Sequence, residues 1–550
     1  MFTNKTISSL FGLDISISIF LGAFMKLLSN ISKVSIFTIF FLSNVFAQID
    51  GATAHMAEAL PKKEIGKELY NQYCATCHHE KRVGIDGPPL LPNNLKKYDE
   101  KDLASKIKDG FPQTLMPKYD FLSLYELHQI ARYIKSPIDG VFSWDLNDIN
   151  KSITSFKDPL NPLNIKDKEQ ILPVVERDGN KTWIMEDRRV LSKFPLNNIH
   201  GGIKFTMDAK TIYVPTRDGW IQNYSLETGQ RMNKIRACIN LRNISLSRDE
   251  QNLFATCLLP EQLVVMNPKT MEAKDILKIE GKISALYELY SKDEAIFTFR
   301  DKPLIGRLDT KTNEIKYIDI KEPIEDFFID PFDDFLIGTA RGGDVLRVYS
   351  LKDNSVVFEH EMKGMPHLFS ATYWYKDGNF YFATPHIKKS YITIWKMYDW
   401  EFVKEVDIKG DGFFVKTHPN TPYLWADNGS DKLVLIDKND YSLKTITPRE
   451  GKKYIHTEYS GDGKYAYLSI YEQNGEIIVI DTNSFKELAS YDANVPVGKY
   501  NFINKNREFY PRLFGIDIFK QNCNSKLPCD SSSFNYYENK SFEDFKKTIK

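Results

Sequence analysis

Leu435-Ile-Asp437 ends an apolar stretch and opens the polar turn Asp437-Lys-Asn-Asp440, after which a further strand-like stretch begins. Seven other segments end an apolar stretch in the same way: Trp183-Ile-Met-Glu186, Asn223-Tyr-Ser225, Val265-Met-Asn267, Arg307-Leu-Asp309, Val348-Tyr-Ser350, Ile394-Trp-Lys396 and Val479-Ile-Asp481. The last residues of these eight markers are 39, 42, 42, 41, 46, 41 and 44 positions apart. Units of about 40 to 45 residues made of short strands are typical of four-stranded propeller blades, whereas helical repeats show a period of about 3.6 residues. The sequence therefore predicts an all-β eight-bladed propeller over residues 166-506.

The same period aligns one further position of each blade. Counting 25 positions back from the markers reaches His200, Arg242, Ser284, Glu325, Gly412 and His456, and the corresponding part of the longest unit contains His367. Equivalent positions of a propeller lie on one ring around its axis. Imidazoles can bind a metal or move protons, and arginine can pair with carboxylates. We therefore expect a ligand site on this ring, although a single loop histidine is more often structural.

A short motif ahead of the propeller predicts a different kind of site. Cys74-Ala-Thr-Cys77-His78 has the C-x-x-C-H pattern in which two thiols attach heme c covalently and the histidine supplies an axial nitrogen. A zinc half-site or a redox dithiol would leave the histidine unexplained. Met116, in Phe111-Pro-Gln-Thr-Leu-Met116-Pro117, is the expected sixth ligand, with a core methionine as the alternative. Residues 60-137 are thus expected to form a small all-α class I cytochrome c domain.

The N-terminus favours an exported protein, and the net charge does not favour a nucleic-acid partner. Lys26 and Lys33 precede an apolar stretch that ends at Ala47, which predicts a secretory signal peptide over residues 1-47, with Met25 as an alternative start. An uncleaved anchor is the other interpretation. The chain has 73 Lys+Arg and 73 Asp+Glu, so its charge does not favour nucleic acid. We expect a periplasmic protein with no nucleic-acid partner and no membrane span after signal cleavage.

The sequence assigns no catalytic or binding role to two segments and leaves the pairing of four cysteines undecided. Residues 138-165 are expected to be a linker, and residues 507-550 form a tail of unknown role. Cys523 and Cys529 are a plausible disulfide in an oxidising compartment. Cys238 and Cys257 lie near the two ends of one blade's early strands, where they are either paired or simply buried.

Three segments resemble a known family. They are Ile199-His200-Gly-Gly-Ile-Lys-Phe-Thr-Met-Asp-Ala-Lys-Thr-Ile-Tyr-Val-Pro-Thr-Arg217-Asp218-Gly219, Gly412-Phe-Phe-Val-Lys416-Thr417-His418-Pro419 and Pro496-Val-Gly498-Lys499-Tyr500-Asn501. Together with a cytochrome c domain before an eight-bladed propeller, they make residues 60-505 similar to the heme d1 proteins, namely cytochrome cd1 nitrite reductase and its relatives in heme d1 biosynthesis. The resemblance implies a non-covalent heme d1 or dihydro-heme d1, bound as substrate, product or cofactor.

The departures from the family pattern favour one kind of member. The nitrite reductases of the family keep two histidines that donate protons to nitrite. Here Glu325 stands at the first of these positions, and the stretch Thr372-Tyr-Trp-Tyr375 at the second contains no histidine. The resemblance therefore implies a dihydro-heme d1 dehydrogenase, which oxidises a propionate side chain to an acrylate in the last step of heme d1 synthesis.

The resemblance also implies a role for each site residue. His200 and His367 are expected to bind the iron, His456 to accept a proton, and Tyr500 to assist by hydrogen bonding. Arg217, Arg242 and His418 are expected to bind the tetrapyrrole, the two arginines through its carboxylates. Electrons would leave through the heme c held by Cys74, Cys77, His78 and Met116 to a periplasmic electron acceptor.

Two alternatives belong to different classes of function. One is a nitrite reductase in which Glu325 and His456 replace the lost proton donors. The other is a non-catalytic protein that binds heme d1 and delivers it, which would make nitrite reductase or other d1-assembly proteins its partners. The turnover of nitrite distinguishes the first, and binding without oxidation of the ligand distinguishes the second.

Overall fold

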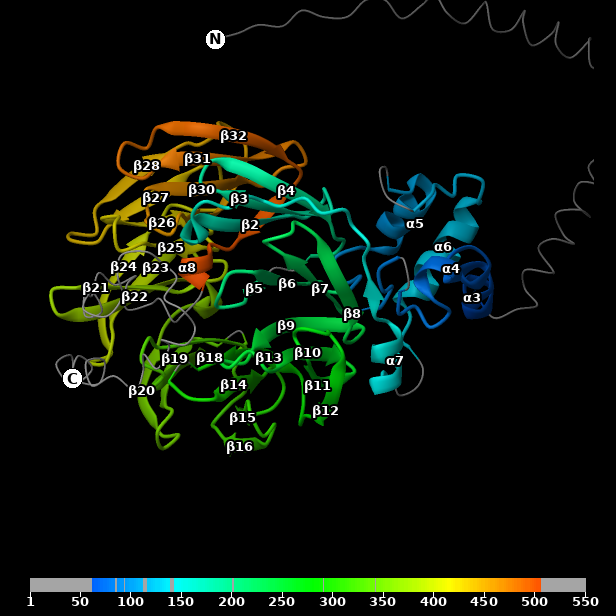
Figure 1. Ribbon diagram of the computed structural model, residues 1–550, viewed down its shortest axis with the longest axis horizontal. Helices are drawn as coiled ribbons and strands as arrows, with labels where there is room; N and C mark the ends of the chain where they lie inside the picture. Colours follow the sequence, from blue (N-terminus) through cyan, green and yellow to red (C-terminus); the bar gives the residue numbers. More distant parts are fainter. Residues whose placement is uncertain are drawn as a thin grey trace, which may run out of the picture. The chain divides into compact units, whose positions relative to one another are not determined.

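The eight markers all lie at the end of the third strand of a blade, and the eight blades surround one centre (Figure 1). A computed structural model of the chain describes residues 62–84, 87–92, 94–111, 116–138, 143–199, 202–289, 291–341 and 343–505. The chain divides into two units, Met1–Ile138 and Asp139–Lys550. None of the helices within the described ranges is long and apolar enough to cross a membrane. The predicted signal peptide and the predicted pair Cys523 and Cys529 lie outside these ranges.

Each blade is a four-stranded antiparallel sheet, and its first strand lies nearest the axis. Blades 1 to 4 are β33 (Pro496–Lys499), β2 (Ile171–Glu176), β3 (Lys181–Glu186) and β4 (Arg189–Pro195); β5 (Lys204–Phe205), β6 (Thr211–Pro215), β7 (Trp220–Ser225) and β8 (Arg231–Arg236); β9 (Asn240–Leu246), β10 (Leu253–Leu259), β11 (Glu261–Met266) and β12 (Ala273–Lys278); and β13 (Ile283–Glu288), β14 (Glu294–Phe299), β15 (Leu304–Asp309) and β16 (Ile315–Asp319). Blades 5 to 8 are β17 (Asp326–Ile329), β18 (Phe335–Thr339), β19 (Val345–Ser350) and β20 (Val356–Glu361); β21 (Thr372–Lys376), β22 (Asn379–Pro385), β23 (Tyr391–Lys396) and β24 (Glu401–Asp407); β25 (Val415–Lys416), β26 (Tyr423–Asp427), β27 (Leu433–Asp437) and β28 (Leu443–Ile446); and β29 (Tyr454–Tyr459), β30 (Tyr465–Ile470), β31 (Gly475–Asp481) and β32 (Glu487–Ala493).

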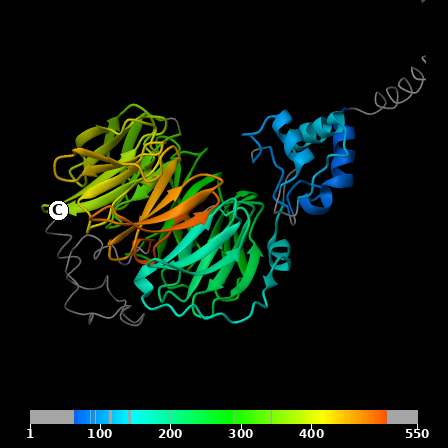
Figure 2. The same cartoon turned by 90° about the horizontal axis from the view of Figure 1, so that it is seen from above.

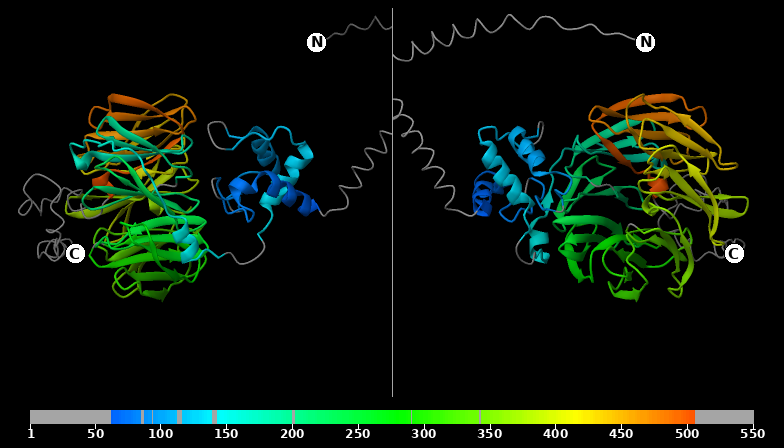
Figure 3. Two further views of the ribbon diagram at one scale, coloured as in Figure 1. Left: turned by 45° about the vertical axis from the view of Figure 1, so that its right-hand side comes forward. Right: turned by 180° about the vertical axis from the view of Figure 1, so that it is seen from behind.

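Blade 1 closes the ring because it combines strands from both ends of the propeller. The C-terminal strand β33 pairs antiparallel with β2, with Val174 opposite Lys499. Figures 2 and 3 show β2 to β4 beside the C-terminal blade 8. A closed ring leaves only the short edges of its blades unpaired, which is how propellers avoid aggregation through strand edges. The predicted eight-bladed propeller is confirmed.

Burial along the strands follows their place in the blade. The middle strands are buried almost continuously, as in β2 and β14, because each blade packs face to face against two neighbours. The outermost strands alternate, as β20 does, because only one of their faces meets the next blade. The longest apolar stretches of the sequence are therefore the middle strands, and these made the period visible.

The N-terminal unit contains the helices expected of a cytochrome c domain. They are α3 (Lys62–Tyr73), α4 (Ala75–His78), α5 (Glu100–Asp109) and α6 (Leu124–Lys135). Capping boxes at Asp99 and Ser123 start the last two helices. A Cβ on Gly66 would lie 2.3 Å from the carbonyl oxygen of Gln129, so the glycine permits the close packing of α3 on α6. The predicted small all-α domain is confirmed.

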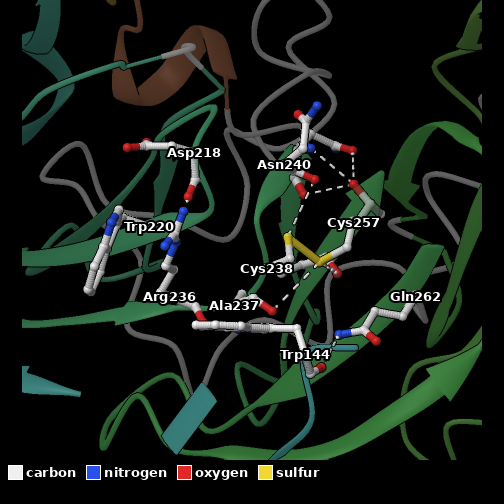
Figure 4. Close-up of a disulfide and its surroundings, with 12 residues drawn as sticks. Trp144, Asp218, Trp220, Arg236, Ala237, Cys238, Asn240, Cys257 and Gln262 are labelled. Atoms are coloured by element: carbon white, nitrogen blue, oxygen red, sulfur yellow. Dashed lines mark hydrogen bonds between the residues drawn. A yellow bond between two sulfur atoms is a disulfide. The ribbon is translucent and has the colours of Figure 1, made fainter. Parts of the chain in front are cut away.

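The segment predicted as a linker has structure of its own in the propeller unit. It contains α7 (Leu146–Lys151), and β1 (Thr154–Ser155) adds a fifth strand beside β8. Trp144, among the first described residues after the gap, packs on blades 2 and 3: its Nε1 donates to the carbonyl of Arg236 at 3.0 Å, and Gln262 Nε2 donates to the carbonyl of Trp144 at 3.1 Å (Figure 4). Three short helices, η1 (Lys168–Gln170), η2 (Leu368–Ser370) and α8 (Phe502–Lys505), complete the unit.

Cys238 and Cys257 of blade 3, which the sequence left as either paired or simply buried, form a disulfide. Their Cα atoms lie 6.0 Å apart (Figure 4). Cys257 lies on β10 opposite Leu241 of β9, so the hairpin of these strands brings the two cysteines together. Both side chains are fully buried. The bond therefore crosslinks the chain just before β9 to β10.

Candidate functional site

The C-x-x-C-H motif folds as a single helical turn, α4, whose N-cap is Cys74. Cys74 and Cys77 are both partly exposed, and burial, followed by the nearby Cys77, raises the pKa of the Cys74 thiol to about 12. Redox dithiols instead depend on a lowered thiol pKa. The environment of this pair therefore fits covalent attachment of a porphyrin better than disulfide exchange.

The surroundings of His78 fit an axial ligand. Its Nδ1 lies 2.8 Å from the carbonyl oxygen of Pro88, so Nδ1 carries the proton and Nε2 keeps its lone pair for a metal. A Cβ on Gly87 would lie 2.5 Å from the His78 ring, so only glycine fits there. Met116 and Cys74 both pack against the same hydrophobic core. These residues can hold heme c, with His78 and Met116 as its axial ligands.

In the propeller, hydrogen bonds between neighbouring blades connect the predicted ring positions. Arg242 Nε donates to the carbonyl of Ser284, and Ser284 Oγ donates to the carbonyl of Glu325. Next to Glu325, Asp326 contacts His367 of the following blade. These partners are 41 or 42 residues apart, which is one blade. The count from the markers therefore identified positions that are neighbours around the axis.

His367 is held by a buried carboxylate. Its Nδ1 lies 2.7 Å from Asp326 Oδ2, while Asp326 Oδ1 accepts a hydrogen bond of 2.5 Å from the backbone N–H of Phe369. Asp326 is 2% exposed, and burial raises its pKa while the hydrogen bond to His367 opposes this rise. A histidine that donates Nδ1–H to a carboxylate presents Nε2 as a basic ligand atom. This geometry suits the predicted role of His367 as an iron ligand.

Two aromatic rings connect His367 to His456. The ring centroid of Phe413 lies 4.3 Å from that of His367, and that of Phe414 lies 5.0 Å from that of His456. The two phenylalanines contact each other edge to face. Phe413 is 43% exposed, an unusual exposure for a large apolar side chain at the start of an innermost strand. The structure therefore places both histidines on one apolar wall.

Tyr500 directly follows the closing strand β33 and belongs to the same ring of residues. A hydrogen bond from the backbone of Gly202 reaches its phenol group, and burial raises the pKa of the phenol despite that bond. Gly202 is two positions from His200 in the sequence. His200 itself lies outside the described residues, so its role as an iron ligand stays a prediction. Tyr500 thus contacts Gly202, which follows the predicted ligand His200 by two positions.

The sequence predicted Arg217 as a ligand of the tetrapyrrole, but not that it belongs to a second ring of positions. The loop that follows the second strand of a blade has an arginine as its first or second residue in four blades: Arg177, Arg217, Arg300 and Arg341. Because the strands of a blade alternate in direction, this loop lies on the same face as the start of the first strand. Counting one blade length back from Arg217 reaches Arg177, and counting two and three blade lengths forward reaches Arg300 and Arg341, so the period contained this signal as well.

The arginines are close enough to affect one another. Burial, together with the charges of Arg177, Arg242 and Arg300, lowers the pKa of Arg217 to about 10. Burial and the charge of Arg242 also lower the pKa of Arg300, whereas Glu325 opposes the change. Arg300 Nε lies 3.6 Å from Glu325 Oε1, so this arginine has a carboxylate partner. Clustered guanidinium groups of this kind favour an anionic ligand.

These groups divide the ring into two parts. Blades 1 to 5 contribute Arg177, Arg217, Arg242, Arg300 and Arg341, while blades 6 to 8 and the closing strand contribute His367, Phe413, Phe414, His456 and Tyr500. We call these ten residues the axial site. One part can bind carboxylates, and the other can bind a metal and accept protons.

Comparison with known proteins agrees with this site. The family model described as cytochrome D1 heme domain matches residues 166–505, which is more than half of the chain. The chain belongs to the cytochrome D1 heme domain family. A second model, described as cytochrome c oxidase, cbb3-type, subunit III, matches residues 61–134. Heme c is accordingly the cofactor of the N-terminal unit, and the family of the propeller is a heme-binding one.

Individual relatives cover both units of this D1 heme domain protein. The dihydro-heme d1 dehydrogenase of Pseudomonas aeruginosa is 30% identical over 480 residues, which cover 83% of this chain and 96% of the relative. The nitrite reductase of Stutzerimonas stutzeri is 20% identical over 536 residues, covering 82% and 94%. A solved structure, the dihydro-heme d1 dehydrogenase NirN in complex with DHE, has a TM-score of 0.77 at 29% identity and covers 80% of this chain and 99% of its own.

One predicted ligand of the D1 heme domain needs correction. The axial site lies at the face of the propeller where the first strands begin. His418 follows the end of β25 and contacts Gly461 in the loop after the end of β29, so it lies at the opposite face. Its Nε2 lies 3.3 Å from the carbonyl oxygen of Gly461, its Nδ1 accepts from the backbone N–H of Asn420 at 3.2 Å, and a Cβ on Gly463 would collide with its ring. His418 is 3% exposed, and burial lowers its pKa to about 4. It is a structural histidine.

Proposed function

We propose that this protein is a periplasmic dihydro-heme d1 dehydrogenase. It oxidises a propionate side chain of the tetrapyrrole, –CH2–CH2–COO⁻, to the acrylate –CH=CH–COO⁻. The reaction breaks two C–H bonds, forms one C=C bond and releases two protons and two electrons. The site must therefore bind a polyanionic macrocycle, remove protons beside a carboxylate and pass the electrons on.

The division of the axial site carries this proposal. The arginines of blades 1 to 5 form a binding surface for the carboxylates of the ligand, and the pKa of Arg217 remains far enough above neutral pH for the side chain to stay charged. The histidines and Tyr500 lie on the other part of the ring. A ligand held by its carboxylates would thus present one side chain and its metal to the imidazoles.

His200 and His367 are the proposed ligands of the tetrapyrrole iron. His367 reaches the site from the turn before β21, and its Asp326 partner fixes the ring and makes Nε2 more basic. Arg242 also stacks over the ring of Phe369, 5.1 Å from its centroid, beside the backbone N–H that binds Asp326. The arginine and the histidine are therefore positioned by one network.

His456 is the proposed proton acceptor, and Tyr500 the group that assists it. His456 is partly exposed on the apolar wall next to Phe414, where a neutral imidazole can accept a proton from the substrate. Tyr500 keeps its proton because burial raises the pKa of its phenol group, so it can donate a hydrogen bond. Bound heme c supplies an outlet that takes electrons one at a time to a periplasmic acceptor.

The alternative of nitrite reduction lacks its proton donors. Glu325 lies beside Arg300, so a carboxylate paired with an arginine stands where an imidazole donor is required. The second position falls on β21, whose residues Thr372–Lys376 include no histidine. Two protons are consumed for each nitrite reduced to nitric oxide and water, and neither of these two positions carries an imidazole to supply them.

Anaerobic mixing of the purified protein with dihydro-heme d1 tests the proposal. We expect the absorption spectrum to change to that of heme d1 while heme c becomes reduced, with no nitric oxide formed after addition of nitrite. Binding without conversion would identify a delivery protein, and release of nitric oxide would identify a reductase. Either result would contradict a dehydrogenase.

A pair of histidine variants assigns the proton acceptor. His456→Gln should bind the tetrapyrrole but lose its conversion. His360→Gln is the matched control, because His360 stacks on Phe358 and Phe402 of the outer strands β20 and β24, away from the axis. Unchanged turnover by His456→Gln would remove His456 from the proposed chemistry.

The domain boundaries are part of the same proposal. We retain a signal peptide over residues 1-47, a cytochrome c domain over residues 60-137, a linker over residues 138-165 and a heme d1 propeller over residues 166-506. N-terminal sequencing of the exported protein tests the cleavage site after Ala47. A first residue upstream of Ala47 would contradict it.

A further inference from the structure

His456 occupies a strained position in its strand. The register of β29 and β30 shifts between Ile455, opposite Ser469, and Thr457, opposite Leu468, so His456 is the extra residue of a bulge. Its φ is 51°, in the left-handed region that a side chain other than glycine seldom adopts. A bulge redirects a side chain, and such a conformation persists only when its surroundings hold it in place.

The backbone of His456 is held at both of its polar groups. Its N–H donates to the buried carboxylate of Asp427, which also accepts the N–H groups of Phe413 at 2.6 Å and Phe414 at 3.1 Å. Its carbonyl accepts a hydrogen bond of 2.6 Å from Lys499 Nζ. The first contact comes from blade 7 and the second from the closing strand β33, so both neighbouring blades hold the bulge.

The Lys499 side chain that makes this contact is fully buried. Its three donors meet three acceptors: the carbonyl of His456, Ser469 Oγ at 2.5 Å and the carbonyl of Val497 at 3.4 Å. A buried ammonium group is costly unless all its donors are satisfied. Hydrophobic residues of similar volume are often more stabilising at such sites, which favours a role in specifying a local geometry.

The residues on either side of Lys499 concern Tyr500, the group proposed to assist His456. A Cβ on Gly498 would lie 2.5 Å from the hydroxyl oxygen of Tyr500, so the phenol ring folds back over the glycine. The N–H of Tyr500 donates to the carbonyl of Pro173 at 3.0 Å, which fixes the segment to β2. One short segment, Gly498 to Tyr500, therefore sets the positions of both His456 and Tyr500.

We propose that Lys499 is a positioning residue for His456: by binding the carbonyl of the bulged residue, it holds the imidazole toward the substrate. This inference deepens the proposed function, on which it rests for the role of His456. Without Lys499, the strand can relax into a regular ladder, and a shift of one residue would turn the side chain to the other face of the sheet.

Lys438 provides a matched control within the same protein. It is another buried lysine, and its Nζ donates to the carbonyls of His418 at 2.9 Å and Thr421 at 2.6 Å. Lys499 thus holds a histidine carbonyl at the axial site, and Lys438 holds a histidine carbonyl away from it. Substitution of either by Met removes the donors at nearly constant volume.

The first test observes the imidazoles directly and needs no turnover. We would record the ¹⁵N imidazole signals of the ten histidines in the reduced protein without tetrapyrrole, and assign His456 from the signal lost in His456→Gln. Lys499→Met should shift or broaden the His456 signal and leave His418 unchanged, whereas Lys438→Met should do the reverse. An unchanged His456 signal in Lys499→Met would overturn the proposal, whatever the protein catalyses.

The second test separates binding from chemistry. Lys499→Met should bind dihydro-heme d1 within about twofold of the wild-type affinity but convert it about 100-fold more slowly, the loss that a misplacement of about 1 Å can cause. The double variant Lys499→Met/His456→Gln should be no slower than His456→Gln alone, because the lysine acts through the histidine. Additive losses would contradict this mechanism.

Lys499→Arg keeps a positive donor and covers the case in which Lys499→Met does not fold. It should restore a single His456 signal and part of the turnover. If neither variant folds, Lys499 serves stability alone and the inference is wrong. If the wild-type protein did not convert dihydro-heme d1, the proposed function would be wrong. The imidazole signals would still test whether Lys499 positions His456.

Discussion

His367 Nδ1 lies 2.7 Å from Oδ2 of Asp326, and the two residues come from adjacent blades, 41 positions apart in the sequence. The contact joins the first residue of β17 to the turn before β21. It fixes the orientation of the imidazole from outside its own blade. Nε2, the proposed ligand atom of His367, is therefore placed by the packing of the propeller and not by the local turn alone.

Replacement of Asp326 by Asn should weaken tetrapyrrole binding. The amide keeps the shape of the carboxylate but lacks its charge, and loss of a partner that orients a ligand typically costs about 10- to 100-fold in affinity. Titration of the protein with dihydro-heme d1, followed by absorption, measures this change. Asp330→Asn is the control, because Asp330 is fully buried at the far end of the same strand, where it binds the N–H groups of Phe332, Asp334 and Phe335. Equal affinities of the two variants would contradict the role of Asp326.

The arginines of the axial site should contribute affinity through charge. Arg217→Gln and Arg300→Gln should each weaken binding of the tetrapyrrole by about 10- to 100-fold, as expected for a lost hydrogen bond between charged groups. Arg449→Gln should have no effect, because Arg449 is already neutralised by Glu476 and Glu487 on blade 8. The wild-type affinity should also fall with salt, and a salt-independent affinity would argue against carboxylate binding.

The period of the sequence predicted much of this structure. The markers lie at the ends of the third strands, where burial by two neighbouring blades demands apolar residues, so the pattern is strong there. The ring positions followed from the same count. Arg177, Arg300 and Arg341 were not predicted because the loop after the second strand was not counted as a second ring.

Other features depend on contacts between blades and leave no local signal. The bulge at His456 is held by Asp427 and Lys499, which come from the two neighbouring blades. The motif Gly412 to Pro419 predicted one site, but Gly412 precedes and His418 follows the short strand β25, so the two residues lie at opposite faces of the propeller. The pairing of Cys238 with Cys257 required the register of a hairpin. Such features need the three-dimensional fold.

Loss of the disulfide should destabilise the propeller. Cys238 and Cys257 are separated by 19 positions, and a crosslink over a loop of this size contributes about 3 kcal/mol by limiting the unfolded chain. Cys238→Ala/Cys257→Ala should therefore lower the free energy of unfolding by about that amount, measured by guanidinium unfolding without reductant. Addition of dithiothreitol should destabilise the wild-type protein during unfolding and leave the variant unchanged. The same effect of reductant on both proteins would contradict the bond.

Stability should rise with pH between 7 and 9 because of the two buried lysines. Burial lowers the pKa of both Lys438 and Lys499 to about 7 from the usual 10.5. Above pH 7 the folded protein releases these protons while the unfolded chain retains them, so the unfolded state binds more protons and the free energy of unfolding increases with pH. Each lysine contributes on the order of 1 kcal/mol per pH unit in this range.

Guanidinium unfolding at a series of pH values measures this slope, and substitutions assign it. Lys438→Met and Lys499→Met should each remove about half of the rise, and the double variant should show none, because the two lysines lie in different blades and contribute independently. Lys409→Met should keep the full slope, since the Lys409 side chain is 77% exposed. A stability that is flat or falls between pH 7 and 9 in the wild-type protein would mean that both lysines keep their protons in the folded state. Their buried ammonium groups would then be stabilised by the carbonyls of His418 and His456 more strongly than burial disfavours them.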